Sequence, residues 1–451
     1  MIEPRVLKGF RDYLPNVEIL RRRMMADLSQ VFSLFGFVPI DTPALEYSEI
    51  LLGKGSDESD RQLFRFNDQG GRDIAMRFDL TVPLARFTAQ HIDTLGTPFK
   101  RYHIAPVWRA EKPQRGRYRE FVQCDFDTIG TSSPYADAEI VAVMNAALTK
   151  LNIPHCIKVN NRRVLNGFLA SLGADSSGNA VSGTSVLRAL DKLEKLGREV
   201  VTAELEKEAR LSPEQIEKVF SFVALSKGDA AAGTKDSQAL IEKLFATYPA
   251  EDAKNGITEL QTVITGAHAL GVPKNQLVID LSIARGLDYY TGSVFETVPL
   301  DLPEIGSICS GGRYDNLVGS FSKRHLPGVG ASVGLDRILG LYEALAKLPE
   351  QASTASILVT VLDQSGYTTS AGIATSIRQA GLACEVYPEI SSLKDQIRYA
   401  NKKGIRYLVI VGAREVESGA VAIKDLNAQT QTDGVKIAAV ATALQKLMSN
   451  D

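Results

Sequence analysis

The stretch from Lys100 to Gly130 constrains the fold more than any other part of this 451-residue chain. Pro113 and Gly116 interrupt it near the middle, which predicts a strand, a turn and a second strand. A period of two then places five side chains of the second strand on one face: Arg119, Phe121, Gln123, Asp125 and Asp127. At roughly 3.3 Å per residue, Phe121 to Asp127 spans about 20 Å. This face is either a solvated sheet surface with scattered charges or a site.

The same stretch is locally basic, although the whole chain has a formal net charge of −2. Glu111 is the one acid between Lys100 and Arg119, against seven bases: Lys100, Arg101, Arg109, Lys112, Arg115, Arg117 and Arg119. Such a local excess is suited to binding phosphate. The overall charge excludes a generally basic nucleic-acid binder but not a local basic surface.

The totals limit the class of protein. The chain is too long for one core, so two or three domains are expected. A hydrophobic fraction of 44% with 23% charged residues is ordinary for a globular protein. Neither a signal peptide nor a membrane span is predicted, since no stretch approaches about 18 apolar residues. Four cysteines without CxxC or Cys/His pairing, and therefore without a zinc site, favour a reducing cytoplasm. They are Cys124, Cys156, Cys309 and Cys384.

The secondary-structure pattern divides the chain into four parts. Residues 1–169 and 269–348 are rich in strand patterns and predict an α+β core, and strands and turns dominate from Phe64 to Gly130. Residues 170–268 are helical, and Ser212, Pro213 and Gln215 predict a helix start there. Residues 355–451 alternate strand and helix, which predicts a separate α/β domain. The expected fold class is therefore α/β with an α+β core.

Three parts of the chain resemble motifs of the class II aminoacyl-tRNA synthetases. Val107 to Glu111 and Gly116 to Phe121 look like motif 2, whose matching residues imply that Arg109 binds the α-phosphate of ATP. The same motif implies that Glu111 meets the adenine edge, Phe121 stacks on adenine and Arg117 faces the pyrophosphate. Gly328 to Arg337 is similar to motif 3, in which Arg337 would pack on adenine. Without the resemblance, Gly328 to Arg337 would be a glycine-rich turn between a strand and a helix. Leu20 to Pro43 resembles motif 1, which forms a dimer interface.

The run from Ala284 to Gly292 resembles the signature of the histidyl-tRNA synthetases, and Ser310 to Asp315 matches the same family. The resemblance implies that Arg285 bridges the histidine carboxylate and the α-phosphate, which makes Arg109 and Arg285 the expected catalytic residues. Tyr289 and Tyr290 would line the imidazole pocket, and Asp127 would accept a ring N–H. Gln123, Asp79 and Thr81 would bind the ammonium group. Read without the family, Asp79 is a turn or strand-edge carboxylate.

The expected protein is thus an enzyme that activates L-histidine with ATP and transfers it to histidine tRNA. The resemblance implies a class II antiparallel sheet flanked by helices, a helical insertion and an anticodon-binding C-terminal domain. It also implies a homodimer and Mg²⁺ accompanying ATP, with ligands unknown. A zwitterion in a pocket needs a paired charge at each end, and the substrate carboxylate is itself the nucleophile.

Three cations at a spacing of four on one predicted helix face are candidates for RNA contact, although a solvated face explains them equally well: Lys394, Arg398 and Lys402. Two other functions remain open. One is a regulatory paralogue that binds histidine without catalysis, although such proteins tend to lose the Arg285–Tyr290 signature and the C-terminal domain. The other is a class II synthetase for threonine or proline.

Overall fold

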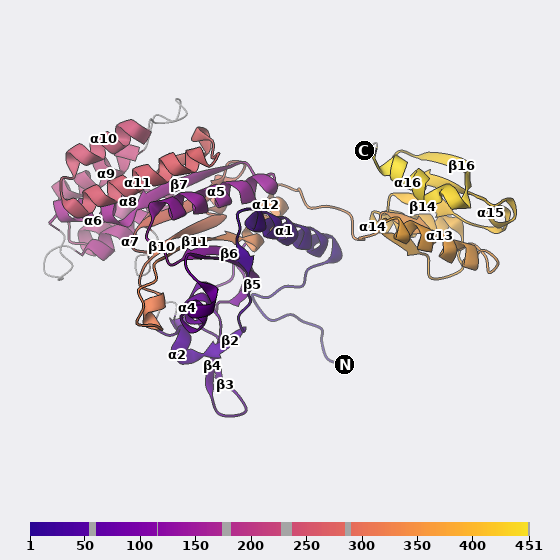
Figure 1. The fold of residues 1–451 in the computed structure, drawn as a ribbon, viewed down its shortest axis with the longest axis horizontal. Helices are drawn as coiled ribbons and strands as arrows, with labels where there is room; N and C mark the ends of the chain where they lie inside the picture. Colours follow the sequence, from indigo (N-terminus) through magenta and orange to yellow (C-terminus); the bar gives the residue numbers. More distant parts are fainter. Residues whose placement is uncertain (54–59, 115, 174–181, 227–236, 285–289, 450–451) are drawn as a thin grey trace. The chain divides into compact units, whose positions relative to one another are not determined.

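The computed structural model describes residues 1–53, 60–114, 116–173, 182–226, 237–284 and 290–449 (Figure 1). The chain divides into two compact units. The larger comprises Met1–Arg11 and Met24–Ala344, and the smaller comprises Asp12–Arg23 and Leu345–Asp451. The predicted limits of the helical insertion and of the C-terminal domain remain predictions.

An eight-stranded sheet forms the centre of the larger unit, in the order β1-β5-β6-β11-β10-β9-β7-β8. Its six central strands are antiparallel, and the two outer strands β1 and β8 pair in parallel with their neighbours. This is the antiparallel-dominated sheet that the sequence predicts. The strands are β1 (Val38–Pro39), β5 (Phe99–Trp108), β6 (Glu120–Ile129), β7 (His155–Asn161), β8 (Leu277–Ile279), β9 (Ser293–Pro299), β10 (Cys309–Tyr314) and β11 (Gly328–Gly334).

Helices cover one face of this sheet. The helix α1 (Pro15–Leu34) places the ring of Phe32 at 4.9 Å from Phe126 of β6 and 5.5 Å from Tyr102 of β5. The helices α5 (Pro134–Lys150) and α12 (Leu335–Ala344) also pack on strands of the sheet. Because side chains alternate along a strand, the residues next to Phe126 point to the opposite face.

The opposite face is approached by a helix that the sequence analysis missed. The helix α4 (Thr81–Leu95) lies within the stretch where strands and turns were expected to dominate, and no helix was predicted there. It packs against the short helix α2 (Ser48–Leu51), and its Arg86 pairs with Glu46 of a second, three-stranded sheet in the order β2-β4-β3. These strands are β2 (Leu45–Tyr47), β3 (Arg65–Asn67) and β4 (Asp73–Met76).

Between β7 and β8, the described residues are predominantly helical (Figure 1). The predicted start at Ser212 is confirmed as a capping box, because Ser212 and Gln215 exchange hydrogen bonds of 2.8 and 3.3 Å between side chains and backbone N–H groups. The helices are α6 (Arg162–Ser171), α7 (Gly183–Asp191), α8 (Leu193–Lys207), α9 (Pro213–Ser226), α10 (Ser237–Thr247) and α11 (Glu251–Ala269).

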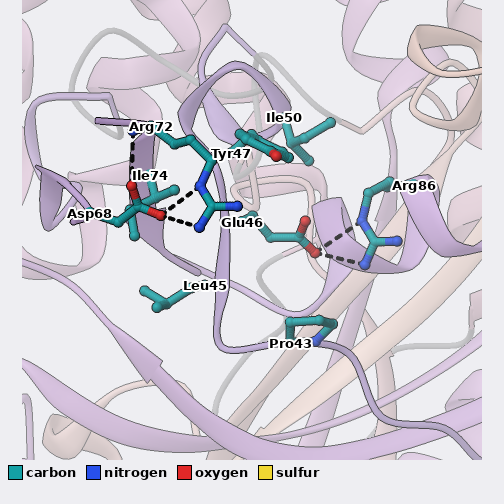
Figure 2. Close-up of a pocket in the computed structure, with 9 residues that line it drawn as sticks. All are labelled: Pro43, Leu45, Glu46, Tyr47, Ile50, Asp68, Arg72, Ile74 and Arg86. Atoms are coloured by element: carbon teal, nitrogen blue, oxygen red, sulfur yellow. Dashed lines mark hydrogen bonds and ion pairs between the residues drawn. The ribbon is translucent and has the colours of Figure 1, made fainter. Parts of the chain in front are cut away.

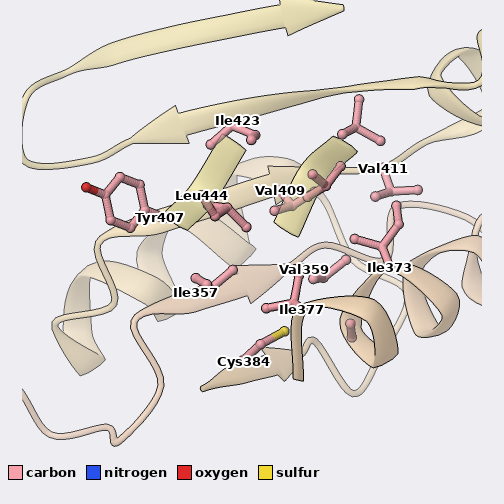
Figure 3. Close-up of a cluster of buried hydrophobic side chains, with 13 residues drawn as sticks. Ile357, Val359, Ile373, Ile377, Cys384, Tyr407, Val409, Val411, Ile423 and Leu444 are labelled. Carbon is pink, nitrogen blue, oxygen red and sulfur yellow. The ribbon is translucent and has the colours of Figure 1, made fainter. Parts of the chain in front are cut away.

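The smaller unit has its own sheet in the order β13-β12-β14-β15-β16 and its own apolar core. Val359, Ile373 and Ile377 lie in this core (Figure 3). The alternation of strand and helix predicted for this part of the chain is broken near its end, where β15 and β16 follow each other directly after a short helix. The elements are β12 (Ile357–Val359), α13 (Tyr367–Gln379), β13 (Cys384–Val386), α14 (Leu393–Lys403), β14 (Tyr407–Ile410), α15 (Ala413–Ser418), β15 (Ala420–Asp425), β16 (Thr430–Lys436) and α16 (Val440–Ser449).

Candidate active site on the open face of the central sheet

The polar residues of β6 share the sheet face that is opposite α1. Cross-strand pairing places Arg101 of β5 beside Asp127, and Ser332 of β11 beside Asp125. The main chain of α4 meets the same face, because Arg101 Nη2 donates to the Leu80 carbonyl over 3.4 Å. The alternation predicted for this strand therefore holds, and it directs a row of polar groups towards the start of α4.

Asp79 lies at the start of α4 and caps it. Its Oδ1 accepts hydrogen bonds from the N–H groups of Thr81 and Val82 over 3.1 and 3.0 Å. Burial raises the pKa of Asp79, while Val82 N–H, Arg109 and Arg101 lower it. Within the described residues, no hydrogen bond is recorded for Oδ2. Asp79 therefore caps a helix, whereas the simpler interpretation of the sequence had it in a turn or at a strand edge, and it still offers one oxygen to a cation.

Arg109 lies between two aromatic rings. Its guanidinium carbon is 4.3 Å from the ring centroid of Phe78 and 5.0 Å from that of Phe121. Its Nε donates to the Phe78 carbonyl over 3.1 Å. In the described part of the chain, no hydrogen bond is recorded for its two terminal nitrogens. A guanidinium fixed in this way presents its fork to a planar anion such as a carboxylate or phosphate.

Asp127 is already partly occupied. Its Oδ2 lies 2.7 Å from Nη2 of the buried Arg101, and Tyr314 donates its hydroxyl to Oδ1. The contact with Arg101 lacks hydrogen-bond geometry, so the lone pairs of Oδ2 remain unused among the described residues. A carboxylate has about four acceptor positions. Asp127 can therefore hold Arg101 and Tyr314 and still accept one N–H group from a ligand.

Asp125 was not assigned a role from the sequence. It is 2% exposed, and its Oδ1 has no hydrogen-bond partner among the described residues. Burial raises the pKa of Asp125 to about 7; Arg101 lowers it and Asp127 raises it further. A third carboxylate beside Asp79 and Asp127 makes this part of the face strongly acidic, which suits a cationic ligand.

Asp125 should lower the stability of the free protein as the pH rises. Its pKa is about 7 in the folded state against an ordinary value of 3.8. Between those values the folded protein binds a proton that the unfolded chain has released, so this group's contribution to the unfolding free energy falls as pH rises. Asp125→Asn should therefore raise the melting temperature, relative to the unmodified protein, more at pH 8 than at pH 5. An equal difference at both pH values, in thermal unfolding without ligands, would contradict this assignment.

Tyr290 and Gln123 are the uncharged polar residues that accompany these carboxylates. Burial raises the pKa of Tyr290, and the charges of Asp127, Asp125 and Asp79 raise it further. Its ring lies against Gly312 of β10. Gln123 donates to Ser332 Oγ over 3.3 Å, and its buried Oε1 has no partner in the described residues. The structure therefore brings together most of the histidine-binding residues expected from the sequence. Arg285 and Tyr289 lie outside the described residues.

The residues expected at the nucleotide lie at one end of the face. Arg117 is 3.9 Å from Glu111, and both charges affect the pKa of Arg109. The turn of Gly116 lies against the first turn of α12, since a Cβ at Gly116 would be 4.0 Å from Cα of Arg337. Arg337 donates to the Ser307 carbonyl over 2.6 Å. Phe121, which contacts Arg109, therefore lies on the same strand face as the acidic residues, at the end next to this turn.

Fewer of the seven basic residues between Lys100 and Arg119 are free to bind phosphate than the sequence suggested. Lys100 pairs with Glu139 at 2.8 Å and donates to the Phe35 carbonyl, while Arg101 is fully buried against Asp127. Consecutive residues of a strand point to opposite faces, so Lys100 and Arg101 lie on different faces of the sheet. Neither is available for phosphate, because each already has an acidic partner. Arg115 lies outside the described residues. Four of the seven bases remain: Arg109 and Arg117, the exposed Lys112, and Arg119, which donates to the Glu111 and Lys8 carbonyls.

A cavity of about 520 Å³ lies elsewhere in the larger unit, beside the three-stranded sheet (Figure 2). Its charges are satisfied internally: Arg86 donates to Glu46 over 3.0 and 2.7 Å, and Arg72 pairs with Asp68 at 2.6 Å. None of the residues expected to bind histidine or ATP lines it. The cavity and the candidate site are thus separate features.

The three cations proposed for RNA contact lie on α14 and are all exposed. Arg398 pairs with Asp395 at 2.6 Å, with its side chain 77% exposed. A solvent-facing position allows contact with RNA but does not require it. No helix in the described ranges is both long and apolar enough to pass through a membrane.

Comparison with known proteins bears on the whole chain. Residues 9–338 match the family described as histidyl-tRNA synthetase, and residues 356–447 match the anticodon binding domain. The chain is 52% identical to the histidine–tRNA ligase of Rhodopirellula baltica, over 96% of each protein. It is 44% identical to that of Wolinella succinogenes, over 98% of each. A crystal structure of histidyl-tRNA synthetase from Nostoc sp. PCC 7120 has a TM-score of 0.87 at 35% identity, covering 99% of this chain and 100% of that one. With matches that span both the sheet and the C-terminal domain, the chain belongs to the histidyl-tRNA synthetase family.

Proposed function

We propose that the acidic face of β6, together with Asp79, Arg109 and Tyr290, is where this synthetase joins histidine to ATP. The enzyme activates L-histidine to histidyl-adenylate, releases pyrophosphate, and then transfers histidine to the 3′ end of its tRNA with release of AMP. One observation carries the location of the site. The buried carboxylates of Asp125 and Asp127 on β6 share a sheet face with Phe121, and Phe121 contacts Arg109, whose terminal nitrogens have no hydrogen bond within the described residues. Asp79, at the start of α4, meets the same face.

The acidic end suits the amino group and ring of histidine. The free oxygen of Asp79 and Oε1 of Gln123 would accept hydrogen bonds from the ammonium group, with Thr81 beside them. Asp127 would accept an imidazole N–H, and the hydroxyl of Tyr290 would bond to the ring from the other side. A buried ammonium ion needs such an opposite charge, because an unpaired buried charge is costly.

The basic end suits the reacting anions. Arg109 and Arg285 would hold the histidine carboxylate against the α-phosphate, which neutralises the repulsion between the two. A carboxylate oxygen then attacks the α-phosphorus, and the bond to the leaving pyrophosphate breaks. Phe121 and Arg337 would enclose adenine, Glu111 would meet its edge, and Arg117 would face the pyrophosphate. No protein nucleophile is required, so positioning and charge neutralisation carry the rate.

Mg²⁺ would enter with ATP. Over the described residues, no three His, Cys, Asp or Glu side chains form a cluster that could hold a metal ion. Mg²⁺ usually keeps several waters and binds through one or two carboxylates together with substrate phosphates. Such a set of donors is compatible with an acidic sheet face, and the ion would neutralise phosphate charge.

The enzyme would act as a homodimer in a reducing cytoplasm. The segment resembling motif 1 exposes apolar side chains, with Leu34 80% and Val38 48% exposed, and β1 is an edge strand of the large sheet. A second copy covering this edge would remove both from water. The four cysteines form no disulfide. Sedimentation of the purified protein would test the dimer.

Selectivity for histidine should depend on Asp127 and Tyr290. Asp127→Ala and Tyr290→Phe each leave a polar group of the bound ring unpaired, which typically costs about 1–3 kcal/mol. Both variants should raise the KM for histidine in pyrophosphate exchange by about tenfold or more and leave the KM for ATP nearly unchanged. A raised KM for ATP with an unchanged KM for histidine would mean that the two halves of the site are assigned the wrong way round.

The proposal as a whole is tested by ATP–pyrophosphate exchange with each of the twenty amino acids. Histidine alone should support exchange, and Asp127→Ala should remove its advantage. Exchange with threonine or proline would refute the assignment of the acidic pocket to histidine, and no exchange with any amino acid would favour a regulatory histidine-binding protein.

A further inference from the structure

Arg313 of β10 is a buried cation that the proposed reaction does not use. It is 5% exposed, and its Nε and Nη2 contact Asp137 of α5 over 3.1, 3.2 and 2.7 Å. Asp137 is 1% exposed. A bidentate buried pair of this kind is costly to break, because removal of one partner leaves the other charge uncompensated.

The remaining donors of Arg313 are also used. Nη1 donates to the Thr131 carbonyl over 2.9 Å and lies 3.4 Å from Asp315, and Nη2 donates to the Ser133 carbonyl over 3.1 Å. Ser133 caps α5. A guanidinium has five N–H groups in a fixed plane, and this environment engages each of its three nitrogens. Lysine could not reproduce that arrangement.

The backbone of Arg313 holds the segment that follows Tyr290. The N–H of Thr291 donates to the Arg313 carbonyl over 2.8 Å, and the Thr291 hydroxyl donates to Asp315 over 2.6 Å. A Cβ at Gly292 would lie 2.9 Å from Cδ of Arg313, so the segment packs directly on the arginine side chain. Arg313 therefore contacts this segment through both its main chain and its side chain.

The ring of Tyr290 depends on the same strand. A Cβ at Gly312 would lie 2.7 Å from Cδ1 of Tyr290, so the ring lies directly on β10 next to Arg313. Successive residues of a strand point to opposite faces. Gly312 thus supports Tyr290 on the face of the proposed site, and Arg313 points to α5 on the other face.

We propose that Arg313, held by Asp137, is a positioning residue that fixes Tyr290 for recognition of the imidazole ring. This inference rests on the proposed role of Tyr290. Arg313 touches no substrate and acts through Thr291 and Gly292. A displacement of about 1 Å, caused by a change remote from the reacting atoms, can cost on the order of 10²-fold in rate.

The test uses Arg313→Lys in the full-length enzyme, with KM for histidine, KM for ATP and kcat measured by pyrophosphate exchange. We expect KM for histidine to rise roughly 10- to 100-fold, with KM for ATP within about twofold. Thr291→Val, which removes one hydroxyl bond to Asp315, should shift the histidine KM in the same direction by less. It keeps the inference testable if Arg313→Lys does not fold.

A matched control exists in the smaller unit. Arg406 makes a similar bidentate contact with Asp425 over 3.1, 3.0 and 2.8 Å. Arg406→Lys should leave pyrophosphate exchange unchanged. An unchanged KM for histidine in both Thr291→Val and Arg313→Lys, or an equal rise in both KM values, would overturn the positioning role.

A double-mutant cycle separates this inference from the function on which it rests. If Tyr290→Phe alone leaves histidine use unaffected, the proposed role of Tyr290 fails, and the positioning role fails with it. If Tyr290→Phe alone impairs histidine use, it should add little in the Arg313→Lys background, because residues that act as a unit are not additive. Full additivity would refute positioning while leaving the role of Tyr290 intact.

Discussion

Arg109→Ala should lower histidine-dependent pyrophosphate exchange by about 10²–10³-fold, the usual loss for one electrostatic contact to a transition state. The side chain is fixed between Phe78 and Phe121 and bonded through Nε. Its terminal nitrogens can therefore meet an incoming anion without reorganisation. Lys112→Ala is the matched control, because Lys112 is an exposed cation between the two stretches that resemble motif 2. Activity of Arg109→Ala within tenfold of the unmodified enzyme, with Lys112→Ala unchanged, would contradict the assignment.

Arg285, which is assigned through the family signature, is expected to hold the same two anions as Arg109. We expect Arg285→Ala nearly to abolish exchange, since Arg109 alone would then hold both the carboxylate and the α-phosphate. If kcat fell equally in both single variants and hardly further in the double variant, the two arginines would act as one clamp.

Removal of the C-terminal domain should separate the two steps of the reaction. Each residue assigned to histidine or ATP precedes Leu348, and the domain has a separate sheet and core. A chain truncated after Ser353 should keep pyrophosphate exchange and lose most tRNA charging. The reason is that the domain would supply a second RNA contact and thus a higher effective concentration of the acceptor end. Circular dichroism and sedimentation should first show that the truncated chain folds and dimerises. Full charging by such a folded chain would refute the role of the domain.

The exposed face of α14 allows a finer test of RNA binding. Neutralising Lys394, Arg398 and Lys402 together should weaken tRNA binding and reduce its dependence on salt, by roughly one unit of slope at most for each phosphate contact. Arg398 already pairs with Asp395, so its share should be smaller. Binding titrations at several salt concentrations measure the slope. An unchanged slope and unchanged charging would eliminate this helix face as an RNA contact.

The sequence predicted those parts of the site that follow from local periodicity. The alternation along β6 placed Gln123, Asp125 and Asp127 on one face, and pairing with β5 and β11 confirms that register. The start at Ser212 was also predictable, because a capping box needs only residues three apart. Both features depend on short spacings within one element.

Other features depend on contacts between distant segments, which periodicity does not reveal. Arg101 was counted as a phosphate ligand, but its partner Asp127 lies 26 positions away and on the neighbouring strand. Asp336 of α12 accepts a hydrogen bond from the N–H of Val122 over 2.9 Å, and this bond fixes one end of β6. The helix α4 was missed because its cap, Asp79, also fits a strand edge. Its true role appears only where its Oδ1 meets Thr81 and Val82.

The most direct test of the proposed site is a crystal structure of the enzyme with histidine and a non-hydrolysable ATP analogue. The account predicts the ammonium group within hydrogen-bond distance of Asp79 and Gln123, and the imidazole between Asp127 and Tyr290. It places adenine between Phe121 and Arg337, with the α-phosphate at Arg109. Histidine bound in the separate 520 Å³ cavity beside Glu46 and Arg86, or an imidazole directed away from Asp127, would contradict it.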